Sequence, residues 1–68
     1  MNLKFEEGDK AIVLLNVDGI NNGEVVEIKR VDYADLTLPY LIISINTEKD
    51  AWVNGRDLRI ITNSIKKL

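Results

Sequence analysis

The chain has 68 residues, nine Lys and Arg against eleven Asp and Glu, a formal net charge of −2, and neither histidine nor cysteine. Without cysteine there is no disulfide, thiolate nucleophile or sulfur-ligated zinc, and without histidine there is no imidazole base and no Ser-His-Asp or Cys-His arrangement. We therefore expect a single small domain that is not an enzyme and uses no cofactor or metal.

The composition also indicates where such a domain would work. Small extracellular domains usually depend on disulfides, so their absence favours a reducing compartment, and we expect a cytoplasmic protein. No apolar run approaches the length of a membrane span, so no membrane partner is expected. A chain of this size buries only about 60% of its surface on folding and is marginally stable alone. A partner or a second copy would add to that stability.

Short segments rich in Val, Ile and Leu alternate with turn-forming sequences. The segments predicted as strands are residues 10–17, 24–31, 40–45, 51–53 and 58–62. A single 3₁₀ turn is expected at residues 56–58, just before the last strand. Residues 32–38 form the longest expected loop, and residues 47–50 a hairpin turn. The sequence therefore predicts an all-β domain over residues 1–62 and a C-terminal tail over residues 63–68.

The alternation of side chains predicts which residues face the core. On the first strand it places one apolar set inside, namely Ala11, Val13, Leu15 and Val17. On the second strand strict alternation fails, and we expect a bulge that lets both Val25 and Ile28 point inward. The third strand is apolar on both faces, so it is either central in the sheet or covered. The acidic cluster of Glu6, Glu7 and Asp9 is interpreted as a solvated turn.

Several short motifs follow one another in a characteristic order. The Gly-Asp-Lys-Ala-Ile-Val sequence of residues 8–13 resembles the opening strand of SH3-like small barrels. The Gly-Glu-Val-Val-Glu-Ile sequence of residues 23–28 is similar to the second strand of that group and to KOW domains of ribosomal proteins and transcription factors. Residues 39–42, 52–53 and 57–58 resemble the closing pattern of small bacterial and phage-encoded barrels.

The resemblance implies a five-stranded SH3-like barrel over about residues 5–61 and a phage or mobile-element origin. It does not imply one function, because this barrel serves as a scaffold for many tasks. The acidic composition departs from KOW modules, which are usually basic. The aromatic signature of SH3 domains that bind proline-rich peptides is missing.

Binding to a protein partner is the function that the residue types favour. Trp, Tyr and Arg contribute most of the energy at protein interfaces. The candidate contact residues are Tyr33, Tyr40, Trp52, Arg56, Ile12 and Leu14, with Ile42 as further outward apolar surface. The alternative is that Trp52 and Tyr40 close the small core. An edge strand could also pair with a partner or with a second copy of the chain.

Two other functions stay open. Residues 49–68 carry five basic and two acidic residues, a net +3 against −5 for residues 1–48. The candidate phosphate contacts are Lys49, Arg56, Arg59, Lys66 and Lys67. Because phosphate affinity scales with the number of charges neutralised, we expect such a KOW-like nucleic-acid module to bind weakly at physiological salt. The third reading is a structural subunit whose exposed apolar strand is covered within a complex.

Overall fold

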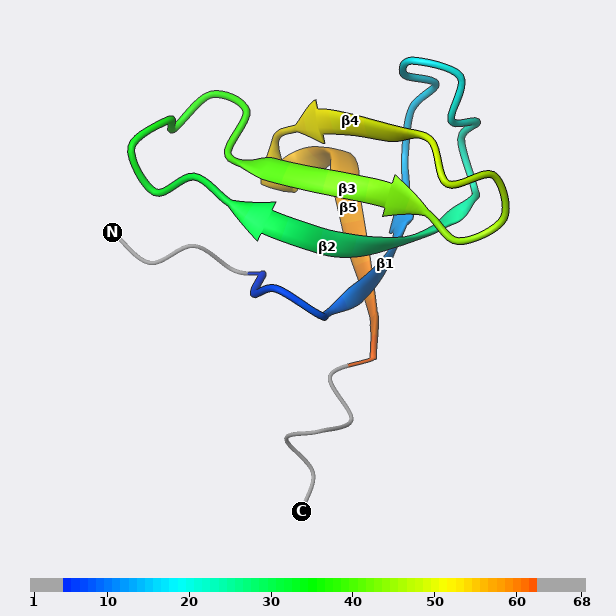
Figure 1. The fold of residues 1–68 in the computed structure, drawn as a ribbon, viewed down its shortest axis with the longest axis horizontal. Coiled ribbons are helices and arrows are strands. Elements are labelled where there is room, and N and C mark those ends of the chain that lie inside the picture. Colours follow the sequence, from blue (N-terminus) through cyan, green and yellow to red (C-terminus); the bar gives the residue numbers. More distant parts are fainter. Residues whose placement is uncertain (1–4, 63–68) are drawn as a thin grey trace.

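The computed structural model of the chain describes residues 5–62, which form five antiparallel strands and one 3₁₀ turn (Figure 1). The elements are β1 (Lys10–Val13), β2 (Val25–Val31), β3 (Tyr40–Ser44), β4 (Asp50–Val53), the 3₁₀ turn η1 (Gly55–Asp57) and β5 (Leu58–Thr62). The predicted all-β class, the five strands and the turn before the last strand are confirmed. The turn begins one residue earlier than expected, and the predicted tail lies outside the described residues.

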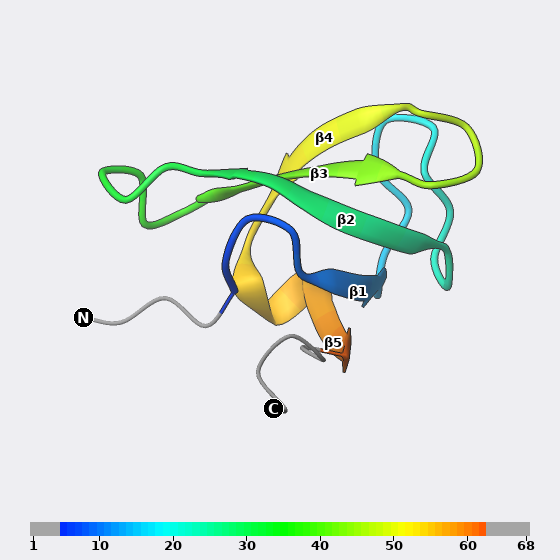
Figure 2. The ribbon, with the colours of Figure 1, turned by 60° about the horizontal axis from the view of Figure 1, so that its bottom comes forward.

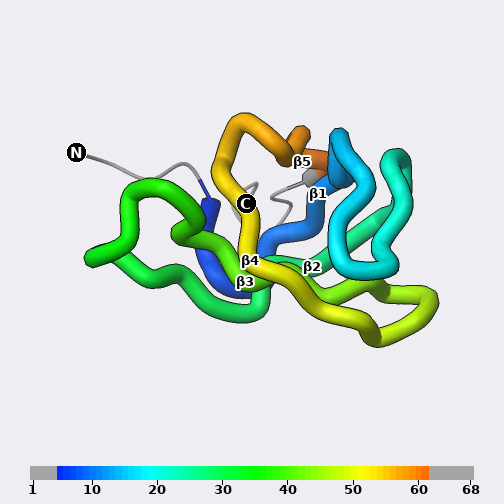
Figure 3. The backbone as a smooth tube through the Cα atoms, turned by 90° about the horizontal axis from the view of Figure 1, so that it is seen from above, coloured from blue at the N-terminus to red at the C-terminus, as the bar shows by residue number. Residues whose placement is uncertain are grey.

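The strands form one strongly bent sheet in the order β4-β3-β2-β1-β5. β2, β3 and β4 make the layer nearest the viewer in Figure 1, and β5 crosses behind them (Figures 1 and 3). Figure 2 shows how β1 and β5 lie below that layer when the molecule is turned. Within residues 5–62, β4 and β5 do not pair, so the sheet remains open and has these two strands as its edges.

The first strand is shorter than the sequence predicted, because the chain leaves the sheet after Val13. The Leu14 N–H donates to the Asp57 carbonyl at 2.8 Å, which ties this departure to η1. A tight turn follows, in which Val17 and Ile20 exchange backbone hydrogen bonds of 2.9 and 2.7 Å. The expected strand over residues 10–17 is therefore wrong in its second half, where the chain bonds to η1 and then enters the Val17–Ile20 turn.

The second strand contains the expected irregularity, but at a later position. The register with β3 shifts between Ile28 and Arg30, so that Val31 again packs against the core. Val26 and Ile28 are fully buried and share one face, whereas Val25 is only half-buried. The prediction that Val25 points inward is therefore wrong, because simple alternation holds up to Ile28 and the bulge comes after it.

The core lies between the two layers. Tyr40 is its largest fully buried side chain, at 1% exposure, and its ring meets the Phe5 ring edge-on at a centroid distance of 5.2 Å. The Tyr40 hydroxyl accepts a hydrogen bond from the Phe5 N–H at 3.3 Å. The other buried apolar residues are Ala11, Val13, Ile20, Val26, Ile28, Ile42, Ala51, Val53 and Leu58. The expectation that Ile42 faces outward is wrong, because the inner face of β3 is the one that carries Tyr40, Ile42 and Ser44.

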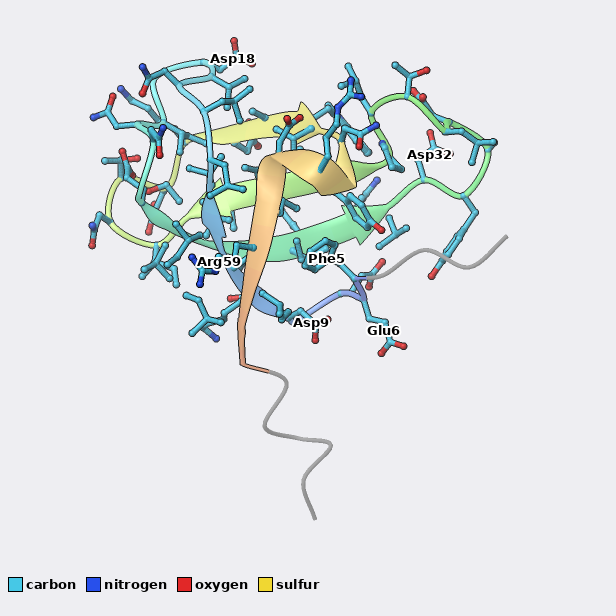
Figure 4. The ribbon with its side chains drawn as sticks, turned by 180° about the vertical axis from the view of Figure 1, so that it is seen from behind. Phe5, Glu6, Asp9, Asp18, Asp32 and Arg59 are labelled. Carbon is cyan, nitrogen blue, oxygen red and sulfur yellow. The ribbon has the colours of Figure 1, made fainter. Side chains whose placement is uncertain are left out.

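The prediction of a solvated acidic turn before β1 holds for Glu6 and Glu7, which are exposed, and is wrong for Asp9. Asp9 is buried, and its Oδ2 accepts a hydrogen bond from the Glu6 N–H at 3.0 Å while its own N–H donates to the Glu6 carbonyl (Figure 4). Gly8 has a φ of +93°, a conformation that side chains rarely adopt, and its N–H donates to the Ile28 carbonyl at 2.8 Å. The Gly-Asp motif therefore joins the start of the chain to β2.

Candidate protein-binding face

A row of three side chains that ends in a tryptophan crosses the outer face of the sheet. The strand register places Arg30 on β2 opposite Leu41 on β3, and Leu41 opposite Trp52 on β4. Directly opposite residues in antiparallel strands point to the same face and pack against one another. Trp52 is nevertheless 41% exposed, because β4 is an edge strand and nothing in the described residues pairs with its far side.

A second row runs parallel to the first. Glu27 on β2 lies opposite Ile43 on β3, which lies opposite Asp50 on β4. Lys10 on β1 lies opposite Glu27 and forms a 4.0 Å ion pair with it. We call Arg30, Leu41, Ile43, Asp50 and Trp52 the outer-face patch. It combines an aliphatic and aromatic centre with one cation and one carboxylate at its margin.

The loop of residues 32–38 lies next to the first row, because it connects β2 to β3. Its tip is held by aspartates: Asp32 Oδ1 accepts from the Ala34 N–H, and Asp35 Oδ1 accepts from the Thr37 and Leu38 N–H groups. The two hydrogen bonds from Leu38 and Thr37 hold the pKa of Asp35 below its usual range. With its backbone bonded in this way, the loop displays exposed apolar side chains, namely Tyr33, Leu36 and Leu38.

The loop is also fastened to η1. The side-chain Nδ2 of Asn54 donates to the Thr37 carbonyl at 2.7 Å, and its Oδ1 accepts from the Arg56 N–H at 3.0 Å. Sequence reasoning singled out Tyr33 but missed Leu36 and Leu38. Asp32 and Asp35 were the sequence signal, because an aspartate often accepts a hydrogen bond from an amide two or three residues later and so forms a structured turn. Such a turn holds the apolar residues of the loop in fixed positions at the surface.

The predicted partner-binding residues do not form a single cluster. Trp52, Tyr33, Arg56 and Leu14 are exposed, and Ile12 is half-buried. Tyr40 is not available at the surface, because it lies in the core. Ile12 lies opposite Val25 and Arg59, which places it on the β1–β5 side of the sheet rather than beside Trp52.

The predicted phosphate contacts come from separate elements. Lys49 lies in the β3–β4 turn, Arg56 in η1 and Arg59 on β5, and all three are exposed. Figure 4 shows Arg59 beside β5 on the back of the molecule, away from the β3–β4 layer. Lys66 and Lys67 lie outside the described residues. Two exposed basic residues that the sequence reading missed, Lys29 and Arg30, are neighbours at the β2 bulge.

Within residues 5–62, no group of three or more acidic side chains is close enough together to hold a metal ion. No helix in the described part of the chain has the length and apolar character needed to cross a membrane. Comparison with protein-family models, with curated proteins and with solved structures found no significant match.

Proposed function

We propose that this chain is a non-enzymatic binding module that contacts a protein partner through the outer-face patch. The observation that carries the proposal is the placement of Trp52, which is 41% exposed in a row with Leu41 and Arg30. Tryptophan and arginine beside aliphatic side chains are the residues that most often dominate interface energy. Trp52 shares its face with the half-buried Leu41 and Ile43, and a contiguous apolar patch of this kind marks a surface that becomes covered on binding.

We further propose that the fold is an open SH3-like barrel. Three features support this assignment: the five antiparallel strands, the strong bend that brings β1 and β5 across the β2–β4 layer, and the 3₁₀ turn directly before the last strand. In such a barrel the core is enclosed by the two layers, and the outer faces of the strands remain available for partners.

A protein partner fits the patch better than nucleic acid does. Phosphate binding needs several cations on one face. The two rows carry Arg30 and Lys10, but Lys10 is paired with Glu27, and Asp50 adds an unfavourable charge. Trp52 is the one aromatic side chain of the patch, and Leu41 and Ile43 beside it are aliphatic, so the patch lacks the several aromatic rings on which successive bases stack.

The test is affinity capture with the whole chain from a lysate of the organism that encodes it, with and without nuclease. We expect captured protein that survives nuclease and is lost when Trp52 is replaced by Ser. The matched control is Ile61→Ser on β5, since Ile61 is exposed to a similar extent, 45% against 41%. Loss of all capture with nuclease would contradict the proposal and favour the nucleic-acid alternative. Equal loss in both variants, with both folded, would exclude the outer-face patch as the specific contact.

A further inference from the structure

The outer edge of β4 presents backbone hydrogen-bonding groups in a defined pattern. The Ser44 N–H donates to the Lys49 carbonyl at 2.8 Å, and the register continues as Ile42 opposite Ala51 and Tyr40 opposite Val53. In an antiparallel pair the bonded and non-bonded residues alternate. The N–H and C=O groups of Ala51 therefore face β3, whereas those of Asp50 and Trp52 face away from it.

The two edges of the sheet differ in how open they are. On β5 the Leu58 N–H is bonded to the Gly55 carbonyl of η1, and the pairing of β5 with β1 contains a register shift between Lys10 and Ala11. The β3–β4 pairing has no shift, and β4 carries no Pro, Lys or Arg. Lysines, prolines and bulges are among the devices that protect edge strands, and β4 has none of them; its protection is limited to its length of four residues and the charge of Asp50. β4 is therefore the edge best suited to accept another strand.

The available stretch of β4 is short and has a clear limit. The turn at Gly19 lies so close to Lys49 that a Cβ on the glycine would come within 2.9 Å of Lys49 Cδ. This turn packs beside the Lys49 side chain, directly before the strand begins. Beyond the strand, the Asn54 N–H and carbonyl are both bonded to Asp57 in the cap of η1. Asp50 to Val53 is thus the only part of the β4 edge that could pair, among the residues described.

We propose that the β4 edge binds an extended segment of a partner protein, which joins the sheet as an added antiparallel strand. This inference rests on the proposed function and specifies how the partner binds. The new strand would receive and donate hydrogen bonds at Asp50 and Trp52, the two residues whose backbone groups face outward. Figure 1 shows β4 at the margin of the front layer, where such a strand would extend the β2–β3–β4 sheet.

The outer-face rows determine the side chains that the segment needs. The residue opposite Trp52 extends the row of Arg30, Leu41 and Trp52, so an aliphatic side chain fits there. The residue opposite Asp50 extends the row that ends in this carboxylate, so a basic side chain forms a cross-strand charge pair. An antiparallel segment passes Trp52 before it reaches Asp50, and residues on one face of a strand are two positions apart. From its N-terminus, the segment therefore has an aliphatic residue, then any residue, then a basic residue.

A synthetic peptide tests this proposal directly. The probe is acetyl-Thr-Thr-Ile-Val-Lys-Thr-Thr-amide, added to the isotope-labelled full chain and followed by NMR. We expect the backbone amides of Asp50 and Trp52 to shift and to exchange with solvent more slowly, while the amide of Ala51 keeps its bond to β3. Four-residue pairings are small, so the expected dissociation constant is in the range of about 0.1 to 1 mM.

Two N-methylated peptides provide matched controls. The N–H groups of the Ile and Lys residues in the probe would face β4, whereas the N–H of the Val between them would face away. Methylation at Ile and Lys should weaken binding about tenfold or more, because the bonds to β4 are lost. Methylation at Val should have little effect. Equal effects of the two peptides would overturn the added-strand geometry.

A charge exchange tests the predicted pairing with Asp50. The Asp50→Lys variant should bind the probe about threefold more weakly, and a probe with Glu in place of Lys should restore binding. Absence of any perturbation at Asp50 and Trp52 would overturn the proposal for the edge, while nuclease-resistant capture that depends on Trp52 would still support the outer-face patch. Dimerisation of the chain alone with these two amides protected would assign the edge to a second copy and overturn the proposal.

Discussion

The Ser44 hydroxyl donates a 2.6 Å hydrogen bond to Glu24 Oε1, which joins the turn before β2 to the end of β3. Ser44 is buried, and its oxygen also accepts from the Thr47 N–H at 3.3 Å in the β3–β4 turn. The other Glu24 oxygen accepts from the Asn21 N–H at 2.7 Å. One carboxylate therefore connects two turns that are distant in sequence, and the bond from Ser44, followed by that from Asn21, lowers the pKa of Glu24.

This linkage predicts acid sensitivity that depends on Glu24. Because the pKa of Glu24 is lower in the folded state, its contribution to stability is present above the pKa of the unfolded chain and is lost as pH falls through the folded pKa. We expect Glu24→Gln to be less stable than the wild-type chain at about pH 7 and to approach it at about pH 3. Urea denaturation followed by circular dichroism at both pH values measures this difference.

The reciprocal variant is Ser44→Ala, which removes the donor and leaves the carboxylate. Acid should reduce the stability of Ser44→Ala less than that of the wild-type chain, because the largest cause of the pKa shift is gone. A difference between Glu24→Gln and the wild-type chain that stays constant between the two pH values would rule out the ionised Glu24 as its source.

Substitution of Tyr40 is expected to lower the stability of the fold much more than substitution of Trp52. Tyr40→Ala removes the largest fully buried side chain and should cost about 3–5 kcal/mol. Tyr40→Phe keeps the ring but loses the acceptor for the Phe5 N–H, so about 0.5–1.5 kcal/mol is expected. Trp52→Ser on the exposed outer face should change the free energy of unfolding by less than about 1 kcal/mol. Chemical denaturation followed by circular dichroism compares all three, and a large loss for Trp52→Ser would place its role in folding.

The sequence pattern alone could not show that Tyr40 is buried and Trp52 is exposed. β3 is apolar on both faces, so alternation identifies two sets without saying which one is inside. The answer depends on the bend of the sheet and on Phe5, which packs against Tyr40 from a position 35 residues earlier in the chain. Such a contact leaves no local signal. The strand positions, by contrast, followed from turn residues and β-branched segments, which act locally.

The predictions failed where backbone bonds to distant residues decide the structure. β1 stops at Val13 because Leu14 bonds to Asp57, and the turn that holds Asp9 is fixed to β2, because the Ile28 N–H donates to the Asp9 carbonyl at 2.9 Å. Of the residues in the proposed outer-face patch, only Trp52 is among the contact residues that the sequence predicted. Trp52 lies opposite Leu41 in a regular β3–β4 register, but Arg30 lies opposite Leu41 only because of the bulge in β2, and the sequence pattern placed that bulge too early.

Gly8 provides a test of the turn that precedes β1. Its φ is +93°, and no atom would lie within 4 Å of an added Cβ, so substitution would cost backbone energy without a steric clash. We expect Gly8→Ala to lose about 1–2 kcal/mol of stability. Glu7→Ala at the neighbouring exposed position is the control and should stay within about 0.5 kcal/mol. Thermal unfolding compares the two, and equal stability of Gly8→Ala and the wild-type chain would show that the turn can adopt another conformation.

Asn54 performs two tasks that two variants can separate. Its Oδ1 caps η1 by accepting from the Arg56 N–H, and its Nδ2 holds the exposed loop by donating to the Thr37 carbonyl. Asn54→Ala loses both bonds and should cost about 1 kcal/mol or somewhat more. Asn54→Asp retains an acceptor for the cap but offers no donor to Thr37.

The loop therefore distinguishes the variants better than global stability does. We expect Asn54→Asp to keep most of the stability of the wild-type chain while the amides of Thr37 and Leu38 exchange with solvent faster, because the loop that displays Tyr33 and Leu36 has lost its attachment to η1. Hydrogen exchange measured by NMR gives both quantities for each variant. If exchange at these two amides is the same in Asn54→Asp as in the wild-type chain, the aspartate bonds within the loop are sufficient to hold it, and attachment to η1 contributes nothing to the display of its apolar side chains.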